Sequence, residues 1–290
     1  MFFRRLFGIG LASDPWRKPG NTDNWDTKIY RELRNEVQDI KPYDDRTDRF
    51  NLLIIGPQSH GKTSFINSIN SVSEEVRSEV CNTRSVGTGE SITTVYRRYK
   101  CGRFFQNFQL GDVRGLTKLK SDIYIEDLKQ LIKGHVKDLY KFGDTWPVSA
   151  SANSDFYIAE PKQETKIHGV ILIVNSIEMY ELPRKHLKDI QNILKELDEW
   201  YVAVSLILTK VDILCEHVKY DIKYIFRSTK VQQALERAIA YFGLPRGNIH
   251  PVVNFEDDTF FSWKTAIPLL LAIKGCLYQA RGHLHNDRSP

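Results

Sequence analysis

The chain has 290 residues, of which 41% are hydrophobic and 27% charged, and its formal net charge is +5. These values are ordinary for a globular protein with a full core, built as one large domain or two small ones. The basic excess, 41 residues against 36 acidic ones, is not the clustered stripe that nucleic-acid binding needs, so we expect no nucleic-acid partner. Four widely spaced cysteines form no CxxC pair, which favours a reducing compartment over a disulfide or zinc framework.

Residues 1–48 predict an N-terminal arm that contains one short helix, at 25–40. The arm begins with MFFRRLFGIGLASDP, where two arginines precede a short apolar stretch. That pattern loosely imitates a signal peptide, and it would also suit peripheral contact with a membrane. We favour a third interpretation, an arm packed on the domain that follows. No run of the sequence reaches the roughly 18 apolar residues that cross a bilayer, so we expect no transmembrane segment.

Apolar runs predict the strands of the rest of the chain. Residues 93–99 and 104–110 flank the sequence Lys-Cys-Gly, which predicts a hairpin with a glycine turn. Three further runs are almost continuously apolar, as expected for strands covered on both faces. These runs span 50–55, 167–174 and 201–212.

Helical periodicity lies between and after these strands. Apolar residues recur at three- and four-residue intervals over 125–139 and 187–197, and residues 266–280 are typical of a buried helix. Alternating strands and helices predict an α/β fold, with a mainly parallel twisted sheet and helices on both faces. We place this domain at 49–280, followed by a polar tail at 281–290. Ligands of such sheets bind at the carboxyl ends of the strands.

A phosphate-binding pattern, GxxxxGK[ST], begins at Gly56 with the sequence GPQSHGKT and lies between a strand and a helix. Gly56 and Gly61 let the backbone turn its N–H groups toward anionic oxygens. The helix that begins near Lys62 adds its positive dipole end. We expect Lys62 to reach the outer phosphates, Thr63 to bind Mg²⁺ through its hydroxyl, and Ser64 to lie beside the nucleotide.

Two further motifs follow predicted strands. In DVRG, the Asp112 carboxylate can hold the Mg²⁺ shell, and the Gly115 N–H can bind a γ-phosphate and respond to its loss. In TKVD, the Asp212 carboxylate can accept the N1–H and amino group of guanine, two donors that adenine lacks. The aliphatic stem of Lys210 can cover the base, and Thr209 stands where most G proteins carry Asn. The three motifs together predict that the nucleotide is GTP or GDP.

Two other parts of the site are less clearly marked. We prefer Thr93 to Thr94 as the switch I threonine that completes Mg²⁺ coordination, and either could be an ordinary strand residue. The sequence HPVVNFED follows a strand where a loop behind the base is expected. Val253, Asn254 and Phe255 therefore either flank the guanine or simply end the strand.

The chain resembles the interferon-induced protein 44 family of GTPase-like proteins. The resemblance runs from PWRK at 15–18 to VVNFED, and includes GDVRGL, LIKGHV at 131–136, and IHGVILIVNS. It implies a Ras-like P-loop NTPase fold, GTP binding, a role linked to interferon or innate immunity, and a largely cytoplasmic location. The chain departs from the family in the loop interior PQSH, and it lacks room for the additional N-terminal TLD-type domain of some relatives.

The loop interior also resembles that of dynamin-type GTPases, which carry Gln-Ser at the same place and a TKxD base box. This resemblance makes Gln58 and Ser59 catalytic candidates, alongside Gly115, and implies a possible homodimer through the nucleotide face. The alternative is that Gln58 and His60 only fill space in the loop.

The sequence leaves hydrolysis open. Leu116 stands where Ras-like proteins use Gln to orient the attacking water, so Gln58, Arg84, Arg114 or a second molecule would have to replace it. We expect a slow, Mg²⁺-dependent GTPase whose turnover rises on self-association or with a partner. The alternatives are a GTP-binding scaffold without turnover and an ATP-using P-loop enzyme, which would give no reason for TKxD.

Overall fold

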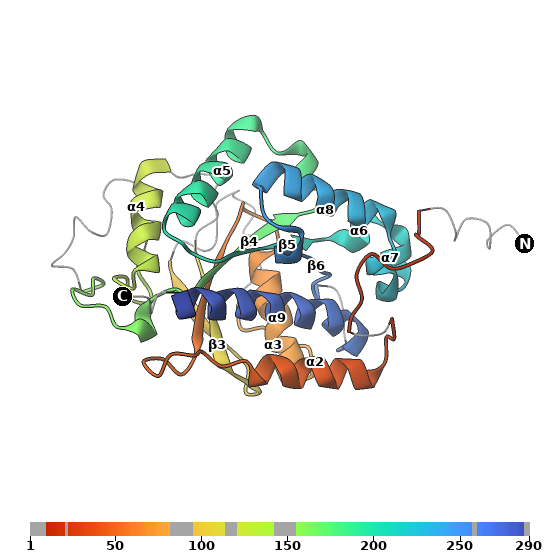
Figure 1. The fold of residues 1–290 in the computed structure, drawn as a ribbon, viewed down its shortest axis with the longest axis horizontal. Helices are drawn as coiled ribbons and strands as arrows, with labels where there is room; N and C mark the ends of the chain where they lie inside the picture. Colours follow the sequence, from red (N-terminus) through yellow and green to blue (C-terminus); the bar gives the residue numbers. More distant parts are fainter. Residues whose placement is uncertain are drawn as a thin grey trace, which may run out of the picture.

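The computed structural model describes residues 10–20, 23–81, 95–113, 121–141, 155–256 and 260–286. Its centre is a six-stranded sheet in the order β2-β3-β1-β4-β5-β6, and helices cover both faces (Figure 1). β2 runs antiparallel to β3, and the other neighbouring strands are parallel. The strands are β1 (Phe50–Ile55), β2 (Arg97–Cys101), β3 (Phe105–Asp112), β4 (Gly169–Asn175), β5 (Val204–Thr209) and β6 (Ile249–Pro251).

The sheet is mainly parallel and has helices on both faces, so the predicted α/β fold class is confirmed. The helices are α2 (Thr27–Asp39), α3 (Lys62–Glu74), α4 (Ser121–Ile132), α5 (Arg184–Glu199), α6 (Val211–Leu214), α7 (Glu216–Tyr220), α8 (Thr229–Phe242) and α9 (Trp263–Asn286). Short 3₁₀ turns are η3 (Gln163–Thr165), η4 (Glu178–Glu181), η5 (Ile222–Phe226) and η6 (Arg246–Asn248).

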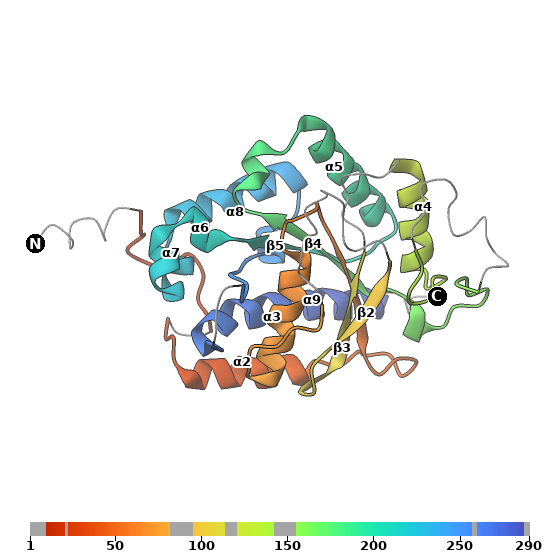
Figure 2. The ribbon, with the colours of Figure 1, turned by 180° about the vertical axis from the view of Figure 1, so that it is seen from behind.

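Two hydrophobic layers flank the sheet because successive side chains of a strand point to opposite faces. In β1, Leu53 and Ile55 pack with α4, α5 and α8, whereas Leu52 and Ile54 pack with α2, α3 and α9. Figure 2, seen from behind, shows the same two layers on either side of the sheet. The apolar run at 266–280 is part of α9, and most of its residues are buried, as predicted. None of the helices in the described part of the chain is both long and apolar enough to cross a bilayer.

The predicted arm contributes to this core. Tyr30, Leu33 and Val37 of α2 are buried, and α2 lies alongside α9 (Figure 1). The Arg34 guanidinium donates to the Val72 and Ser73 carbonyls at the end of α3, over distances of 3.3 and 2.7 Å. The arm is therefore bound to the helix that begins at the phosphate loop. The domain boundaries at 48/49 and 280/281 stay predictions, and α9 continues past the second of them.

The PWRK sequence holds the start of the described chain against η5, α8 and β6. The Trp16 ring packs edge-on against Phe226 with 5.5 Å between centroids, and its indole N–H donates to the Ser228 carbonyl. Arg17 donates to the Ile249 carbonyl over 2.9 Å. The PWRK sequence therefore has a packing role.

The prediction of a helix through residue 139 is wrong, because α4 ends at Ile132. Gly134 adopts a φ of 85°, and a Cβ there would lie 2.9 Å from the Lys166 backbone nitrogen. The chain turns at this glycine, and Val136 then forms a bridge with Tyr157. The apolar periodicity continues past 132, but left-handed backbone and pairing with another segment override it.

The predicted hairpin is confirmed, although its first strand starts later than expected. β2 begins at Arg97, and Val95 forms only an isolated bridge with Lys141. The turn contains Gly102 at a φ of 73°, where a Cβ would lie 2.4 Å from the Ser73 hydroxyl. Glycine is required at this turn because it admits both the dihedral and the close approach.

Candidate functional site

The phosphate-binding pattern forms a tight loop between β1 and α3. Gly56 has a φ of 146°, and a Cβ there would lie 2.2 Å from the Ile173 carbonyl oxygen of β4. Gly61, the residue before α3, has a φ of 92°, and Ser59 is exposed with a φ of 65°. Such left-handed residues turn successive N–H groups toward one side of the loop.

Lys62 is buried beneath this loop. Its ammonium donates to the Gly56 carbonyl over 3.0 Å and to the Pro57 carbonyl over 2.8 Å. Burial lowers the pKa of Lys62 to about 8, and the nearby Asp112 carboxylate opposes that shift. The ammonium is therefore mostly protonated at neutral pH, and a bound phosphate would favour the charge further.

The predicted Mg²⁺ ligands fall partly within the described residues. Asp112 ends β3 beside Ile54 of β1, and its side chain is buried. Thr63 lies in the first turn of α3 and is half-buried, as is Ser64. Thr93, Thr94, Arg84, Arg114, Gly115 and Leu116 lie outside the described residues.

The TKVD sequence, predicted to recognise the base, follows β5, with one difference from the sequence prediction. The strand ends at Thr209, Lys210 has a left-handed φ of 58°, and Asp212 lies in the first turn of α6 rather than at the strand end. The left-handed residue turns the chain away from the sheet. Lys210 and Asp212 are both half-buried and line the same pocket.

Two side chains, one at the end of β5 and one after β6, donate hydrogen bonds to the loop between β1 and α3. The Thr209 hydroxyl donates to the His60 carbonyl over 2.8 Å, and the Asn254 amide nitrogen donates to the Gly61 carbonyl over 3.3 Å. The Asn254 amide oxygen is buried and has no hydrogen-bond partner among the described residues. Thr209 thus links the two motifs although it is not the Asn of most G proteins, and Asn254 adds a second link.

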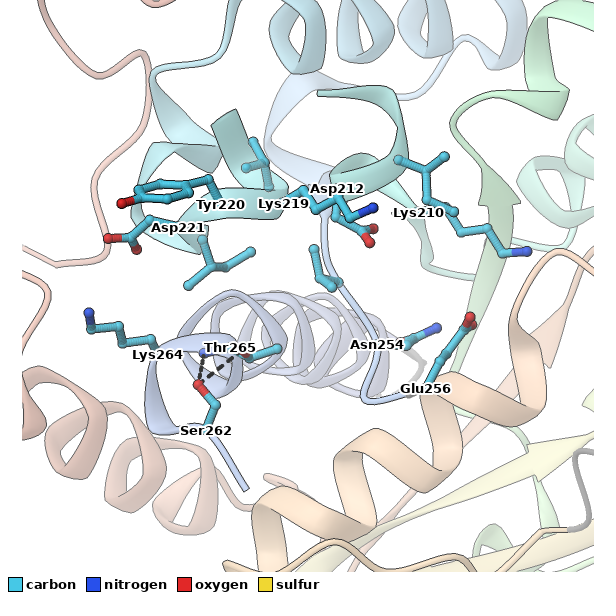
Figure 3. Close-up of a pocket in the computed structure, with 14 residues that line it drawn as sticks. Lys210, Asp212, Lys219, Tyr220, Asp221, Asn254, Glu256, Ser262, Lys264 and Thr265 are labelled. Atoms are coloured by element: carbon cyan, nitrogen blue, oxygen red, sulfur yellow. Dashed lines mark hydrogen bonds between the residues drawn. The ribbon is translucent and has the colours of Figure 1, made fainter. Parts of the chain in front are cut away.

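A pocket of about 610 Å³ opens at this place (Figure 3). Val253 and Asn254 line it, whereas Phe255 is buried in the core and packs against Phe261 with 5.6 Å between ring centroids. Figure 3 shows Asp212, Lys219 and Tyr220 across the pocket from the start of α9. The full lining is Lys210, Asp212, Ile213, Val218, Lys219, Tyr220, Asp221, Ile222, Val253, Asn254, Glu256, Ser262, Lys264 and Thr265.

The sequence interpretation gave His60 no role beyond filling the loop, but the structure places it in a buried polar network. Its Nδ1 accepts the Asn175 N–H over 3.0 Å, and its Nε2 lies 3.2 Å from a Glu178 carboxylate oxygen. A histidine inside a phosphate loop was the available signal, but its partners are more than a hundred residues away. Gln58 is half-buried, and the catalytic roles of Gln58 and Ser59 stay predictions.

The chain is similar in sequence to several interferon-induced proteins. The chain is 29% identical to human interferon-induced protein 44-like over 292 residues, covering 95% of this chain and 63% of that protein. It is 28% identical to mouse interferon-induced protein 44 over 267 residues, covering 89% of this chain and 61% of that protein. The resemblance to the interferon-induced protein 44 family is confirmed. The chain spans less than two thirds of the length of these interferon-induced relatives.

No family model matches the chain. Among solved structures, the chain is similar to a probable GTP-binding protein, engB, with a TM-score of 0.41 and 12% identity, covering 70% of this chain and 88% of that one. A bacterial selenocysteine-specific elongation factor, EF-Sec, gives a TM-score of 0.38 and 14% identity, covering 71% and 26%. At these scores the fold assignment rests on the strand order and the loop described above.

Proposed function

We propose that the chain binds GTP with Mg²⁺ and hydrolyses it slowly, with turnover that increases on self-association or with a partner. One observation carries this proposal: the phosphate loop and the TKxD motif touch through the 2.8 Å hydrogen bond from Thr209 to His60. Lys62 and Asp212 therefore lie at the same edge of the sheet, after the parallel strands β1 and β5. A single nucleotide held at both ends fits this arrangement.

The residues at the phosphate end suit an anion and a divalent cation. Lys62 would exchange two carbonyl contacts for phosphate oxygens, and the N–H groups near Gly61 would complete the cradle. Asp112 and Thr63 supply the carboxylate and hydroxyl oxygens that Mg²⁺ prefers, and Thr93 and Gly115 are the corresponding candidates in the two switches. Bound Mg²⁺ would neutralise the charge of the phosphate oxygens.

The residues at the base end suit guanine. A half-buried Asp212 carboxylate left without donors is costly, so a base with two N–H groups on that edge is preferred over adenine. The Lys210 stem would lie against the ring, while Thr209 and Asn254 hold the loops. This chemistry argues against the ATP-using alternative.

Hydrolysis requires a group that orients the attacking water. Leu116 cannot orient water, so we assign that task to Gln58 and Ser59, with Gly115 on the γ-phosphate, or to a group from a second copy bound through the nucleotide face. If none of these acts, the chain is a GTP-binding scaffold. Leu116 is the specific observation that favours this second candidate.

The names of the relatives suggest a biological setting. They are called interferon-induced, and we propose that the present chain also responds to interferon and acts in the cytoplasm. Because the chain spans only part of those proteins, their complete activities need not apply to it. Measuring the level of this protein before and after interferon treatment would test the first point.

Binding and turnover can be tested separately. We expect GTP to bind at least about 100-fold more tightly to the wild type than to Lys62→Ala, because that variant loses a buried cation on the phosphates. GTP should outcompete ATP for binding. The rate of single-turnover GTP hydrolysis should increase with protein concentration in the wild type, and this increase should be absent in Gln58→Ala. Equal binding of ATP would overturn the guanine assignment, and no phosphate release after long incubation would favour the scaffold.

A further inference from the structure

His60 links three strand ends at the nucleotide edge. It lies in the loop after β1, its ring contacts the end of β4, and its carbonyl accepts the Thr209 hydroxyl at the end of β5. Only 3% of the residue is exposed. A buried imidazole at this place needs hydrogen-bond partners, and they define what it does.

The contacts fix the tautomer of His60. Because the Asn175 N–H donates to Nδ1, the ring proton must reside on Nε2, from which it points to the Glu178 carboxylate. The other Glu178 oxygen accepts from the Asn175 amide over 2.6 Å, and the Asn175 amide oxygen accepts the Ile177 N–H over 3.0 Å. The network is closed on itself, and it connects the loop to the β4–η4 junction.

The charges around the ring keep it neutral. Burial lowers the pKa of His60 to about 3, and the Lys62 and Lys210 ammonium groups add to this shift. Glu178 pulls in the opposite direction, but nearly half of its side chain is exposed to solvent, which weakens its field. A protonated Nδ1 would also face the Asn175 N–H as a second donor, so the neutral form is the one that fits.

We propose that His60 is a positioning residue. Its ring holds the phosphate loop against the end of β4, in the conformation of the loop that binds the nucleotide. This inference rests on the proposed GTP binding. A loop that is already ordered loses less conformational entropy when the phosphates bind, so the network should act on nucleotide affinity and dissociation rate. It should do so through the imidazole contacts to Asn175 and Glu178, without the ring itself contacting the nucleotide.

Three substitutions separate the parts of this role. His60→Asn keeps an acceptor near the Nδ1 position, His60→Gln keeps only a group that reaches toward Glu178, and His60→Val fills the space with an apolar side chain. We expect GTP affinity within about threefold of wild type for Asn, and about tenfold weaker for Gln and Val, the effect of one lost buried hydrogen bond. GTP dissociation, followed by fluorescence of a labelled nucleotide, should accelerate in the same order.

The chain offers a matched control at the other end of β4. His168 is also buried, its Nδ1 accepts the Asn51 N–H over 3.0 Å, and its Nε2 lies 3.1 Å from the Gln163 carbonyl. His168→Val, which removes the same kind of acceptor as His60→Val, should lower the free energy of unfolding and leave GTP affinity unchanged. If His168→Val lost as much affinity as His60→Val, His60 would act through global stability, and the proposal would be overturned.

The remaining outcomes are also decisive. If His60→Val binds GTP as tightly as wild type, the ring only fills space and the inference fails, while Lys62→Ala still tests the function. If the wild type binds no GTP, the proposed function fails and takes this inference with it. A His60→Val chain that does not fold leaves the comparison of His60→Asn with His60→Gln to decide, because each retains polarity and similar volume.

Discussion

A buried histidine accepts a backbone N–H at each end of β4, but the two histidines have different surroundings. At the amino end, His168 accepts the Asn51 N–H, and the Asn51 amide donates to the Glu164 and Lys166 carbonyls and accepts from Gln109. At the carboxyl end, His60 accepts the Asn175 N–H in the same way. Both rings are buried and neutral.

The surroundings of the two histidines differ. The carboxyl end combines a buried lysine ammonium on two carbonyls, an Asn254 amide oxygen that has no hydrogen-bond partner in the described part of the chain, and left-handed backbone at Ser59 and Lys210. Each of these features costs stability, whereas the hydrogen bonds of Asn51 stabilise the fold. Parallel strands bring their loops together at one edge, and the strained groups gather where a ligand can stabilise them. Four predictions test this contrast, with the largest effect first.

Gly56→Ala should destabilise the fold by about 3 kcal/mol, because the new methyl meets a β4 carbonyl and the backbone dihedral is left-handed. Chemical denaturation of the two proteins measures the difference. A loss below 1 kcal/mol would show that the loop can move away from β4, which would weaken the case for a rigid cradle.

Asp212→Asn should weaken GTP binding by about 10- to 100-fold, since the amide cannot accept both guanine donors. Xanthosine triphosphate, which carries a carbonyl in place of the amino group, should bind the variant better than it binds wild type. Competition titrations with the two nucleotides provide the measurement. An unchanged preference for GTP would place the base elsewhere.

Acid should destabilise the fold through His60 and His168, at the two ends of β4. Burial lowers the folded-state pKa of His60 to about 3 and that of His168 to about 4, so the unfolded chain binds more protons below its own pKa of about 6.5. The free energy of unfolding should therefore fall as the pH drops from about 6.5 toward 4, by about 1.6 kcal/mol per histidine between pH 6.5 and 5. His60→Asn and His168→Asn should each make that slope shallower in denaturant melts, and an unchanged slope would show a protonated ring in the folded state.

Gly282→Ala, near the amino edge, should raise the free energy of unfolding by about 0.5 to 1 kcal/mol. Gly282 is an exposed residue of α9, and a Cβ there would meet nothing within 4 Å, so the substitution only improves helix propensity. A glycine-to-alanine substitution should thus stabilise the fold near the amino edge of the sheet, at Gly282, and destabilise it at the carboxyl edge, at Gly56. A destabilised Gly282→Ala chain would indicate a tertiary role for that glycine.

Local sequence patterns were enough to predict the fold class and the order of the motifs. Continuous apolar runs predicted β1, β4 and β5 because strands buried on both faces need apolar residues at every position. The GxxxxGKT pattern predicted the loop before α3, since few residue types allow that backbone. These features depend on neighbouring residues, so local sequence suffices to predict them.

Contacts between distant segments set the end of α4, the packing of α2 and the partner of His60, which local sequence did not predict. Periodicity alone carried the predicted helix past Gly134, whose dihedral and approach to Lys166 end it instead. Tertiary packing also places α2 in the core, and it brings His60 to Asn175, 115 residues away in the sequence. A buried polar side chain takes its role from the partner that satisfies it, and that partner is chosen only when the sheet brings distant segments together.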